Sequence, residues 1–392
     1  METAFVEYAA RLKERLPELA GGEKRACIGL DGFVDRILYV VDQRTGGGSY
    51  RRMETMEAYG RKIAGAAGLS MNVELVPIST KPGGNGVIMA QAASRLGVRT
   101  TCIGAMGKGE LHPVFQPLGK EAALISYAEP ARTDALEFLD GKIISSTLQS
   151  LNEVTWNSLA GTVGTDTLVR VMDEADLIAL NNWTMIPDMT EIWRQMLLQV
   201  FPRLEKRERL LFFDLADPSK RTAADTREAI DVIGQFEAYG ETALSCNVRE
   251  AERLMAVLEL PARSGPREDA PGKALEAACR MLRKRMGISL LVIHTLKSAV
   301  CCRRDRNGAD QVWTVPGNYA SRPVLTTGGG DNFNAGTAFG LLHGLEPDLA
   351  VFLGNVVSGY YVRHGESPAM EGLTRYLDET EEAPGRFENR RD

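Results

Sequence analysis

Long apolar runs are missing from this sequence of 392 residues. No stretch approaches the roughly 18 consecutive apolar residues that a membrane span requires. The chain also lacks an excess of positive charge, because 46 Lys and Arg stand against 52 Asp and Glu, a net charge of -6 at pH 7. This balance argues against nucleic acid as the main partner. Residues 1–19 carry Glu and Arg throughout, which predicts an amphipathic helix and not a signal peptide.

Histidine and cysteine are also sparse. The chain has 4 His and 6 Cys, and no part of it shows the Cys and His spacing of a zinc site. Most of the cysteines fall inside predicted strands, which indicates buried, reduced thiols and predicts a cytoplasmic protein. The composition is typical of a globular protein, and the length allows one large domain with an appendage, or two domains.

The most informative stretch lies near the C-terminus, where residues 326–336 read Thr-Thr-Gly-Gly-Gly-Asp-Asn-Phe-Asn-Ala-Gly. Its glycines are Gly328, Gly329 and Gly330. They run into a predicted helix over 332–343, and such a helix start suits an anion such as phosphate. Asp331 stands at the mouth of this anion hole. A carboxylate beside bound phosphate is repelled by it, so its presence there indicates a task. The obvious task is to accept a proton from an attacking hydroxyl. The alternative is that Asp331 only caps the helix.

Two aspartates follow the first predicted strand, an apolar run over residues 26–30. Asp31 comes directly after this strand and Asp35 precedes a second apolar run over 37–41. Binding groups collect at such strand ends in α/β sheets, so both side chains are candidate ligand contacts. The alternative for either aspartate is the solvation of a loop.

A second glycine segment lies at residues 81–86 and reads Lys-Pro-Gly-Gly-Asn-Gly, ahead of a helix predicted over 87–96. The residues of interest are Gly83, Gly84 and Asn85. Consecutive glycines let the backbone bend around a ligand, and an Asn amide both donates to and accepts from hydroxyl groups. The segment lacks the third glycine of a dinucleotide fingerprint, which disfavours a nicotinamide-dependent oxidoreductase.

Asn247 and Glu250 are three residues apart at the start of a predicted helix that follows a strand. A carboxylate in this position can hold hydrated Mg²⁺, which takes few protein ligands together with waters and phosphate oxygens. The alternative is a capping box, with Asn as N-cap and Glu three residues later, which has the same spacing.

Helices and strands alternate along much of the chain, which predicts a mostly parallel sheet covered on both faces. The regular part begins with a helix over 165–175 and a strand over 177–180. A helix is also predicted over 113–123, and antiparallel strands over 299–302 and 311–315. The Pro- and Gly-rich segment 261–272 is expected to be a loop.

The dipeptide Asp140-Gly141 indicates a β-hairpin with strands over 135–139 and 142–147. A hairpin inserted in an α/β chain suits a lid over a binding site. Residues 43–70 are polar and glycine-rich, so we expect a flexible insertion with a short helix. The tail over 379–392 is highly charged and is expected to be disordered.

Three of these motifs, in this order, resemble signatures of the ribokinase (PfkB) carbohydrate kinase family. They are the Gly-Gly-Asn segment with Gln-Ala-Ala-Ser-Arg-Leu-Gly at 91–97, the Asn-x-x-Glu pair, and the C-terminal glycine segment. The resemblance covers roughly residues 24–370. It implies a ribokinase-like three-layer α/β/α fold with a mostly parallel central sheet and a small β lid. The implied divisions are an N-terminal helix (1–23), a kinase domain (24–378) with lid segments at about 33–50 and 131–150, and the tail.

The resemblance also implies roles for particular residues. Asp331 would be the catalytic base, and the backbone of Gly328, Gly329 and Gly330 would form the anion hole. Substrate contacts are expected from Asp35, Gly83, Gly84, Asn85 and Asn181, and from Asp31, which has no assigned counterpart in the family. Nucleotide contacts are expected from Asn247, Thr295, Lys297 and Asn355, with Glu250 binding Mg²⁺ through water.

The sequence departs from the family pattern at three positions. Leu325 replaces an aspartate that supports a monovalent-cation site, so the resemblance gives no support for potassium activation. Lys297 replaces a glycine and would lie near the nucleotide phosphates; the alternative is a solvent-exposed lysine. Phe33 stands where ribose kinases carry a polar residue, which indicates a substrate other than ribose.

The implied activity is phosphoryl transfer from ATP, with Mg²⁺, to a hydroxyl of a small sugar or sugar-like substrate. An ADP-dependent sugar kinase, a nucleoside kinase and a non-catalytic sugar- or nucleotide-binding regulator stay open as alternatives. No nucleic acid or membrane partner is expected. In many relatives the lid is also a dimer contact, so the resemblance implies a homodimer through the lid.

Overall fold

The computed structural model describes residues 2–19, 23–261, 272–321 and 323–382. A nine-stranded sheet has the order β14-β13-β12-β11-β10-β9-β1-β5-β6. From β12 through to β6 in this order, neighbouring strands are parallel. The pairs β12–β13 and β13–β14 are antiparallel, as predicted. The strands are β1 (Arg25–Gly29), β5 (Arg99–Gly104), β6 (Ala123–Ser126), β9 (Leu177–Asn181), β10 (Leu210–Asp214), β11 (Glu241–Asn247), β12 (Leu290–His294), β13 (Ser298–Arg304) and β14 (Asp310–Pro316).

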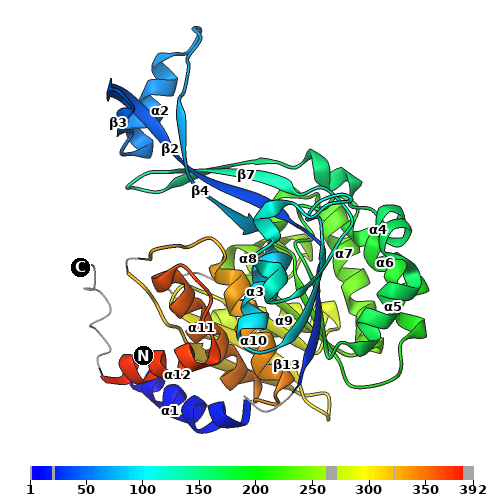
Figure 1. The fold of residues 1–392 in the computed structure, drawn as a ribbon. Coiled ribbons are helices and arrows are strands. Elements are labelled where there is room, and N and C mark those ends of the chain that lie inside the picture. The colour runs from blue at the N-terminus through cyan, green and yellow to red at the C-terminus, as the bar shows by residue number, and fades with distance from the viewer. Residues whose placement is uncertain (1, 20–22, 262–271, 322, 383–392) are drawn as a thin grey trace.

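Helices cover both faces of this sheet, which confirms the predicted three-layer architecture (Figure 1). Strand side chains alternate between the two cores, because Phe213 packs in one and Phe212 in the other. One face holds α4 (Trp156–Val163), α5 (Thr165–Glu174), α6 (Met189–Gln199), α7 (Ala223–Gln235), α8 (Val248–Val257) and α9 (Lys273–Met286). The other holds α1 (Glu2–Leu19), α3 (Asn85–Arg95), α10 (Gly329–Leu342), α11 (Pro347–His364) and α12 (Met370–Glu382).

Close packing of α10 on α11 fixes the helix that begins at the glycine segment. A Cβ on Gly336 would lie 2.9 Å from the Cα of Gly354, and one on Gly340 would lie 2.8 Å from the Cα of Ala350. Only glycine permits backbones to approach this closely. The position of α10 relative to the sheet is therefore set by main-chain contact.

The N-terminal helix α1 is amphipathic, as predicted, and packs on the body of the protein. Leu12 and Leu16 are buried in the same core as α11, and the Phe5 ring meets the Phe352 ring edge-on at 5.1 Å. Arg11 forms an ion pair of 3.0 Å with Asp348 at the start of α11. Residues 20–22, which link α1 to the rest of the chain, lie outside the described residues.

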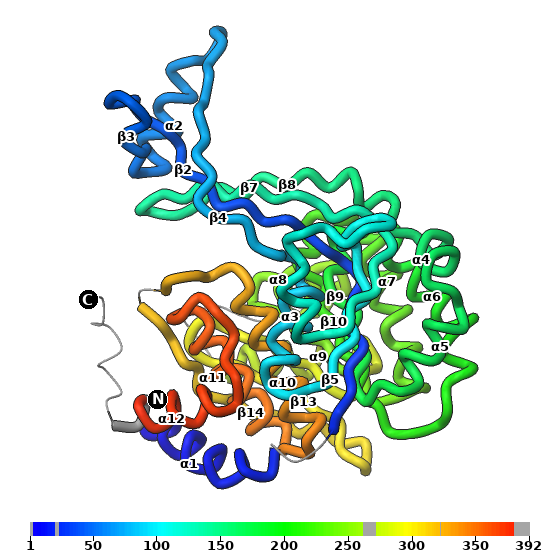
Figure 2. The backbone as a smooth tube through the Cα atoms, viewed as in Figure 1, coloured from blue at the N-terminus to red at the C-terminus, as the bar shows by residue number. Residues whose placement is uncertain are grey.

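A second, five-stranded sheet forms the lid and projects from the body (Figures 1 and 2). Its long strand β2 pairs with the other strands of the lid except β8, which pairs with β7 in the predicted hairpin. The strands are β2 (Phe33–Gly46), β3 (Ser49–Arg52), β4 (Leu75–Gly83), β7 (Ala131–Glu137) and β8 (Lys142–Thr147). The end of β4 leads directly into the Gly-Gly-Asn segment, so the lid and the body meet there.

The structure contradicts the prediction of a flexible insertion over residues 43–70. Strand β2 continues to Gly46, turns into β3, and leads to helix α2 (Met56–Gly65). The short helix was predicted correctly. Met53 and Tyr59 are buried against lid side chains, which holds this segment on the lid, and its other residues are exposed or partly exposed.

Two other predictions were wrong in detail. In place of one helix over 113–123 there are short 3-10 turns at Pro113–Phe115 and Leu118–Lys120, because proline interrupts the backbone hydrogen bonds of a helix. Helix α12 continues to Glu382, so the first part of the predicted disordered tail is helical. Residues 383–392, and residues 262–271 of the predicted loop, lie outside the described residues.

Candidate active site

The C-terminal glycine segment forms the start of α10. Gly328 is the N-cap residue with φ of 90°, a conformation that glycine adopts without steric cost. Tyr361 of α11 donates a 2.9 Å hydrogen bond to the Thr327 carbonyl, and the Gly329 N–H donates to the Thr326 carbonyl at 3.2 Å. These bonds fix the turn that precedes the helix. The positive end of the α10 dipole then faces outward from the turn, which suits an anion.

Asp331 lies in the first turn of α10 and is 7% exposed. The side chain of Asn85 lies beside it, and a Cβ on Gly328 would lie 3.3 Å from Ile88 Cδ1 of α3, so the two glycine segments meet there. Burial, followed by the charges of Asp214 and Asp31, raises the pKa of Asp331 well above its ordinary value. Because one carboxylate oxygen, Oδ1, has no hydrogen-bond partner among the described residues, the group retains capacity to accept a proton.

Asp31 holds the Gly-Gly-Asn segment in place. Its carboxylate accepts hydrogen bonds from the N–H groups of Asn85 (2.8 Å) and Gly86 (2.9 Å) and from Asn182 Nδ2 (2.6 Å). The side chain has no exposed surface, and burial raises its pKa to about 6. The structure therefore shows a supporting role for Asp31, whereas direct contact with a substrate stays a prediction.

Asp35 lies at the base of the lid, on β2. A Cβ on Gly83 would collide with the Asp35 carboxylate, so the glycine permits this close approach. Thr133 of β7 lies directly across from Asp35 in the lid sheet. Burial raises the pKa of Asp35 to about 6. The candidate substrate contacts thus converge where the lid joins the body.

Asn247 and Glu250 form the capping box that was the alternative to a metal site. The Asn247 side chain accepts from Glu250 N at 3.0 Å, and the Glu250 carboxylate accepts from Asn247 N at 2.9 Å. Burial, followed by the charge of Asp214, raises the pKa of Glu250 to about 8. Capping does not account for this concentration of buried negative charge, so the metal role stays a prediction beside it.

The sequence interpretation missed Asp214, at the carboxyl end of β10. It accepts hydrogen bonds from Ala216 N (2.7 Å) and from Asn334 Nδ2 (2.6 Å), one turn after Asp331 on α10. Its charge contributes to the raised pKa of both Asp331 and Glu250, so it links them electrostatically. An acidic residue at the end of a buried strand was the signal that could have found it, as for Asp31.

Two of the four residues predicted to contact the nucleotide, Asn355 and Lys297, contact the end of β14 and the residue after it, and a third, Thr295, contacts Lys297. Asn355 donates a 3.0 Å hydrogen bond to the Pro316 carbonyl, and the Lys297 carbonyl accepts from Gly317 N at 2.9 Å. Thr295 accepts from Lys297 N at 3.1 Å. The fourth, Asn247, is directly across from the residue before Thr295 in the sheet.

Asn181 is fully buried at the end of β9, and its Nδ2 lies 3.0 Å from Met89 Sδ on α3. It occupies the same row of the sheet as Asp214, so it faces the layer that contains α3 and α10. The structure places it against α3, the helix that begins at Asn85, and a contact with a substrate stays a prediction.

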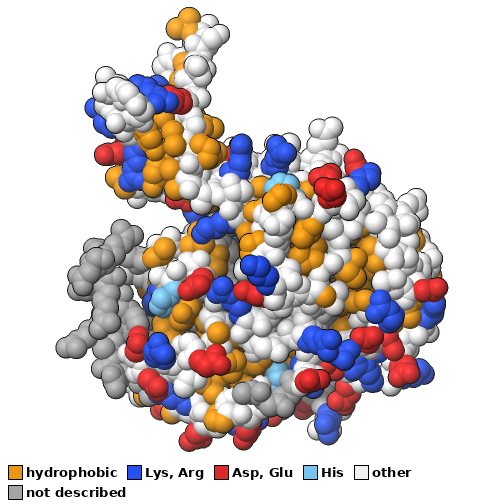
Figure 3. Space-filling model, in the orientation of Figure 1, with side chains coloured by type: hydrophobic (Ala, Val, Ile, Leu, Met, Phe, Trp, Pro, Cys, Tyr) orange, Lys and Arg blue, Asp and Glu red, His pale blue; other side chains and the backbone are white. Residues whose placement is uncertain are grey.

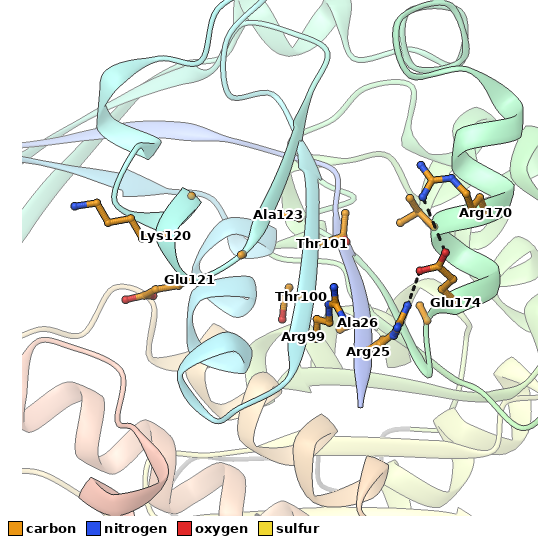
Figure 4. A pocket seen from close by; sticks show the side chains of 14 residues that line it. Arg25, Ala26, Arg99, Thr100, Thr101, Lys120, Glu121, Ala123, Arg170 and Glu174 are labelled. Carbon is orange, nitrogen blue, oxygen red and sulfur yellow. Dashed lines mark hydrogen bonds and ion pairs between the residues drawn. The ribbon is translucent and has the colours of Figure 1, made fainter. Parts of the chain in front are cut away.

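A cavity of about 320 Å³ lies elsewhere, at the amino ends of β1 and β5 (Figure 4). Arg25 and Arg170 both approach Glu174 there, at 2.6 and 4.0 Å. The candidate residues described above follow the carboxyl ends of the strands, so this cavity is at the opposite edge of the sheet and is not the proposed site.

Within the described residues, no group of three or more His, Cys, Asp or Glu is placed to hold a metal ion. In the same part of the chain, no helix is long and apolar enough to cross a membrane. All six cysteines are free and buried, as predicted.

A model of the prokaryotic ketohexokinase family matches residues 1–380. A ketohexokinase from Haloferax volcanii is 28% identical to this chain over 379 residues, covering 95% of this chain and 96% of the relative. Two solved structures share the fold. A ribokinase from Thermotoga maritima has a TM-score of 0.59 at 16% identity, covering 91% of this chain and 100% of that one. An Arabidopsis thaliana ribokinase complexed with ribose and ATP has a TM-score of 0.60 at 14% identity, covering 91% and 99%.

The match to the family model spans nearly the whole chain, and the solved structures share its fold over about nine tenths of its length. The predicted resemblance to ribokinase-like carbohydrate kinases is confirmed. The chain belongs to the prokaryotic ketohexokinase family and is a carbohydrate kinase built on the ribokinase fold.

Proposed function

We propose that this carbohydrate kinase transfers the terminal phosphoryl group of ATP to a primary hydroxyl of a ketohexose. The observation that carries the proposal is the proximity of Asp331 to Asn85 and to the carboxylates of Asp31 and Asp35. This proximity brings the helix start that suits phosphate next to the segment that suits sugar hydroxyls. Ketohexose is proposed as the substrate because of the family and because the Haloferax volcanii relative is named a ketohexokinase.

In the proposed reaction, the sugar hydroxyl gives its proton to Asp331 while its oxygen attacks the terminal phosphorus of ATP. The bond between this phosphorus and the bridging oxygen breaks, and ADP leaves. Burial and the neighbouring aspartates raise the pKa of Asp331, which makes its carboxylate a stronger base than that of an ordinary aspartate.

The substrate would be oriented by Asp35, Asn85 and the backbone of the Gly83-Gly84 pair. Phosphoryl oxygens would be bound by the backbone of Gly328, Gly329 and Gly330 at the positive end of α10. The nucleotide would contact Asn247, Thr295, Lys297 and Asn355. Most of the rate enhancement would come from positioning and from electrostatic stabilisation.

Glu250, through water, and Asp214 are the residues that would hold Mg²⁺. They fit this ion because they are buried carboxylates close enough to raise the pKa of Glu250. Mg²⁺ commonly takes one or two carboxylates together with waters and substrate phosphates, and does not require a full set of protein ligands. When bound, Mg²⁺ would neutralise part of the charge on the phosphate oxygens.

The test is product formation with MgATP across ketohexoses, aldohexoses, sugar acids and nucleosides, followed by ADP in place of ATP. We expect phosphorylated product from a ketohexose with ATP. Turnover supported by ADP but not by ATP would favour the ADP-dependent alternative. Product from nucleosides alone would favour a nucleoside kinase, and no product with any acceptor would favour a binding regulator.

We also propose a homodimer contact through the lid. Figure 3 shows hydrophobic side chains gathered on the lid. The exposed large apolar residues of the lid strands and hairpin are Leu75, Ile78, Leu139 and Ile144. Exposed apolar side chains of this kind are often part of an interaction surface. Light scattering should give the mass of a dimer for the native chain and of a monomer for Ile144→Lys; a native monomer would contradict the proposal.

A further inference from the structure

Lys142 brings a positive charge from the lid to the turn that precedes α10. Its Nζ lies 3.4 Å from Thr327 Oγ1, although the two residues are 185 positions apart in the sequence. Thr327 comes directly before Gly328, the N-cap of α10. The opposite side of this turn is held by Tyr361, so the lysine approaches a fixed structure.

We propose that Lys142 is a catalytic residue that contacts the terminal phosphoryl group during transfer. This inference rests on the proposed function, which places that group at the start of α10. A phosphoryl group brings negative charge into a site that already contains the carboxylates of Asp331, Asp214 and Asp35. A cation beside the anion hole offsets this repulsion, and its effect is greatest in the transition state, where charge builds up on the phosphoryl oxygens.

Glu137 determines the position of Lys142 before phosphate binds. The two residues face each other across the β7–β8 hairpin, and the Lys142 ammonium lies 3.3 Å from a Glu137 carboxylate oxygen. Both side chains remain partly exposed, at 21% and 29%. An exposed ion pair of this kind contributes little to stability. The ammonium can therefore exchange the carboxylate for a phosphate oxygen without a large free-energy cost.

The lid extension, residues 47–74, supports the hairpin that carries Lys142. The hairpin turn is bound to it by hydrogen bonds from Leu139 N to the Glu54 carbonyl (2.7 Å) and from Met56 N to Asp140 Oδ1 (2.7 Å). The Tyr59 ring stacks on Phe138 with centroids 5.6 Å apart, inside a small core of the lid. The extension thus acts as a positioning element for a lysine outside it.

The first experiment compares Lys142→Ala, Lys142→Arg and a control outside the lid, Lys284→Ala. Lys284 is a solvent-exposed lysine in the last turn of α9. We expect kcat to fall by about 10²–10³-fold in the Lys142→Ala variant, the usual loss on removing one group that stabilises transition-state charge. Arginine should restore part of it, and Lys284→Ala should leave kcat unchanged.

Binding measurements separate this role from a structural one. Isothermal titration calorimetry should show that Lys142→Ala weakens ATP binding more than ADP binding, because only ATP carries the group that the lysine contacts. Equal changes for both nucleotides, or unchanged kcat, would overturn the proposal. If Asp331→Asn abolishes turnover while Lys142→Ala does not reduce it, this inference fails and the proposed function stands; if neither variant reduces turnover, both fail.

A double-variant cycle tests the extension. Tyr59→Ala loosens the hairpin, and we expect it to lower kcat in the native background but not in the Lys142→Ala background, since its effect acts through the lysine. Equal losses in both backgrounds would show that the extension has another role. Circular dichroism of Tyr59→Ala, compared with the native spectrum, establishes that any loss occurs in a folded protein.

Discussion

Replacing Asp331 with asparagine removes the proposed base while it keeps the size and shape of the side chain. Asparagine keeps the place of the side chain beside Asn85, so the two glycine segments should remain in contact. What is lost is the capacity to accept a proton. A positioned general base contributes about 10²–10⁴-fold to rate. At about 1.4 kcal/mol for each tenfold, the barrier should rise by about 3–5 kcal/mol.

Asp331→Asn should lower the rate but raise the stability of the folded protein. The folded-state pKa of Asp331 is raised, so the folded protein favours the protonated form, and the ionised form is destabilised as pH rises above the unfolded value. Asparagine is neutral at every pH and avoids this penalty. We therefore expect Asp331→Asn to unfold at a higher temperature than the native protein at pH 8, with a smaller difference at acidic pH.

The measurements are kcat with MgATP and a ketohexose, nucleotide affinity by calorimetry, and thermal unfolding at two pH values. Nucleotide affinity should persist or increase, because a negative charge beside the phosphates is removed. Asp378→Asn serves as control: Asp378 lies on α12 with a side chain 60% exposed, paired with Lys13. If Asp331→Asn retained a tenth or more of the native kcat, Asp331 would not be the base.

Three further predictions concern packing, thiols and pH. Gly336→Ala should destabilise the fold by about 1–3 kcal/mol in urea unfolding, because the new Cβ would lie 2.9 Å from the Gly354 Cα; an unchanged midpoint would contradict the packing argument. The six thiols should react with a thiol reagent only on unfolding, because all are buried and burial raises the pKa of Cys27 to about 12; rapid labelling of the native protein would refute this. The folded-state pKa of Glu250, about 8, lies above its unfolded value of about 4.3, so stability falls as pH rises through 8. Thermal unfolding should therefore occur at a higher temperature at pH 6.5 than at pH 8.5, and Glu250→Gln should reduce this difference.

The site could be predicted where ligand-binding residues sit in short motifs that follow strands. The Gly-Gly-Asn segment and the segment before Asp331 each carry several informative residues in a row, and parallel strands bring such segments to one edge of the sheet. Their contact through Asn85 follows from this geometry. The same reasoning predicted the layers of the fold, since both faces of the parallel strands are buried.

For Asp214 the only local signal is its place at the end of a buried strand. Its partner Asn334 is 120 positions away, and the sequence does not show that the two residues meet. Strand β4 was missed for another reason. It contains two prolines and is mostly exposed, so it shows neither the composition nor the alternation of a typical strand. The order of the lid extension depends on Tyr59 and Phe138 packing together, and the sequence does not show that these distant residues meet.

Strand β2 connects the base of the lid to its tip, so a small rotation at the base moves the tip a long way. Its 14 residues run without interruption from Phe33, next to the candidate sugar contacts, to Gly46 at the far tip. At about 3.3 Å per residue the strand is about 46 Å long. A swing of about 10° at the base would displace the tip by about 8 Å, as follows from that length. Conversely, a partner that binds the tip and holds it in place would restrain the position of the Asp35 carboxylate at the base of the lid.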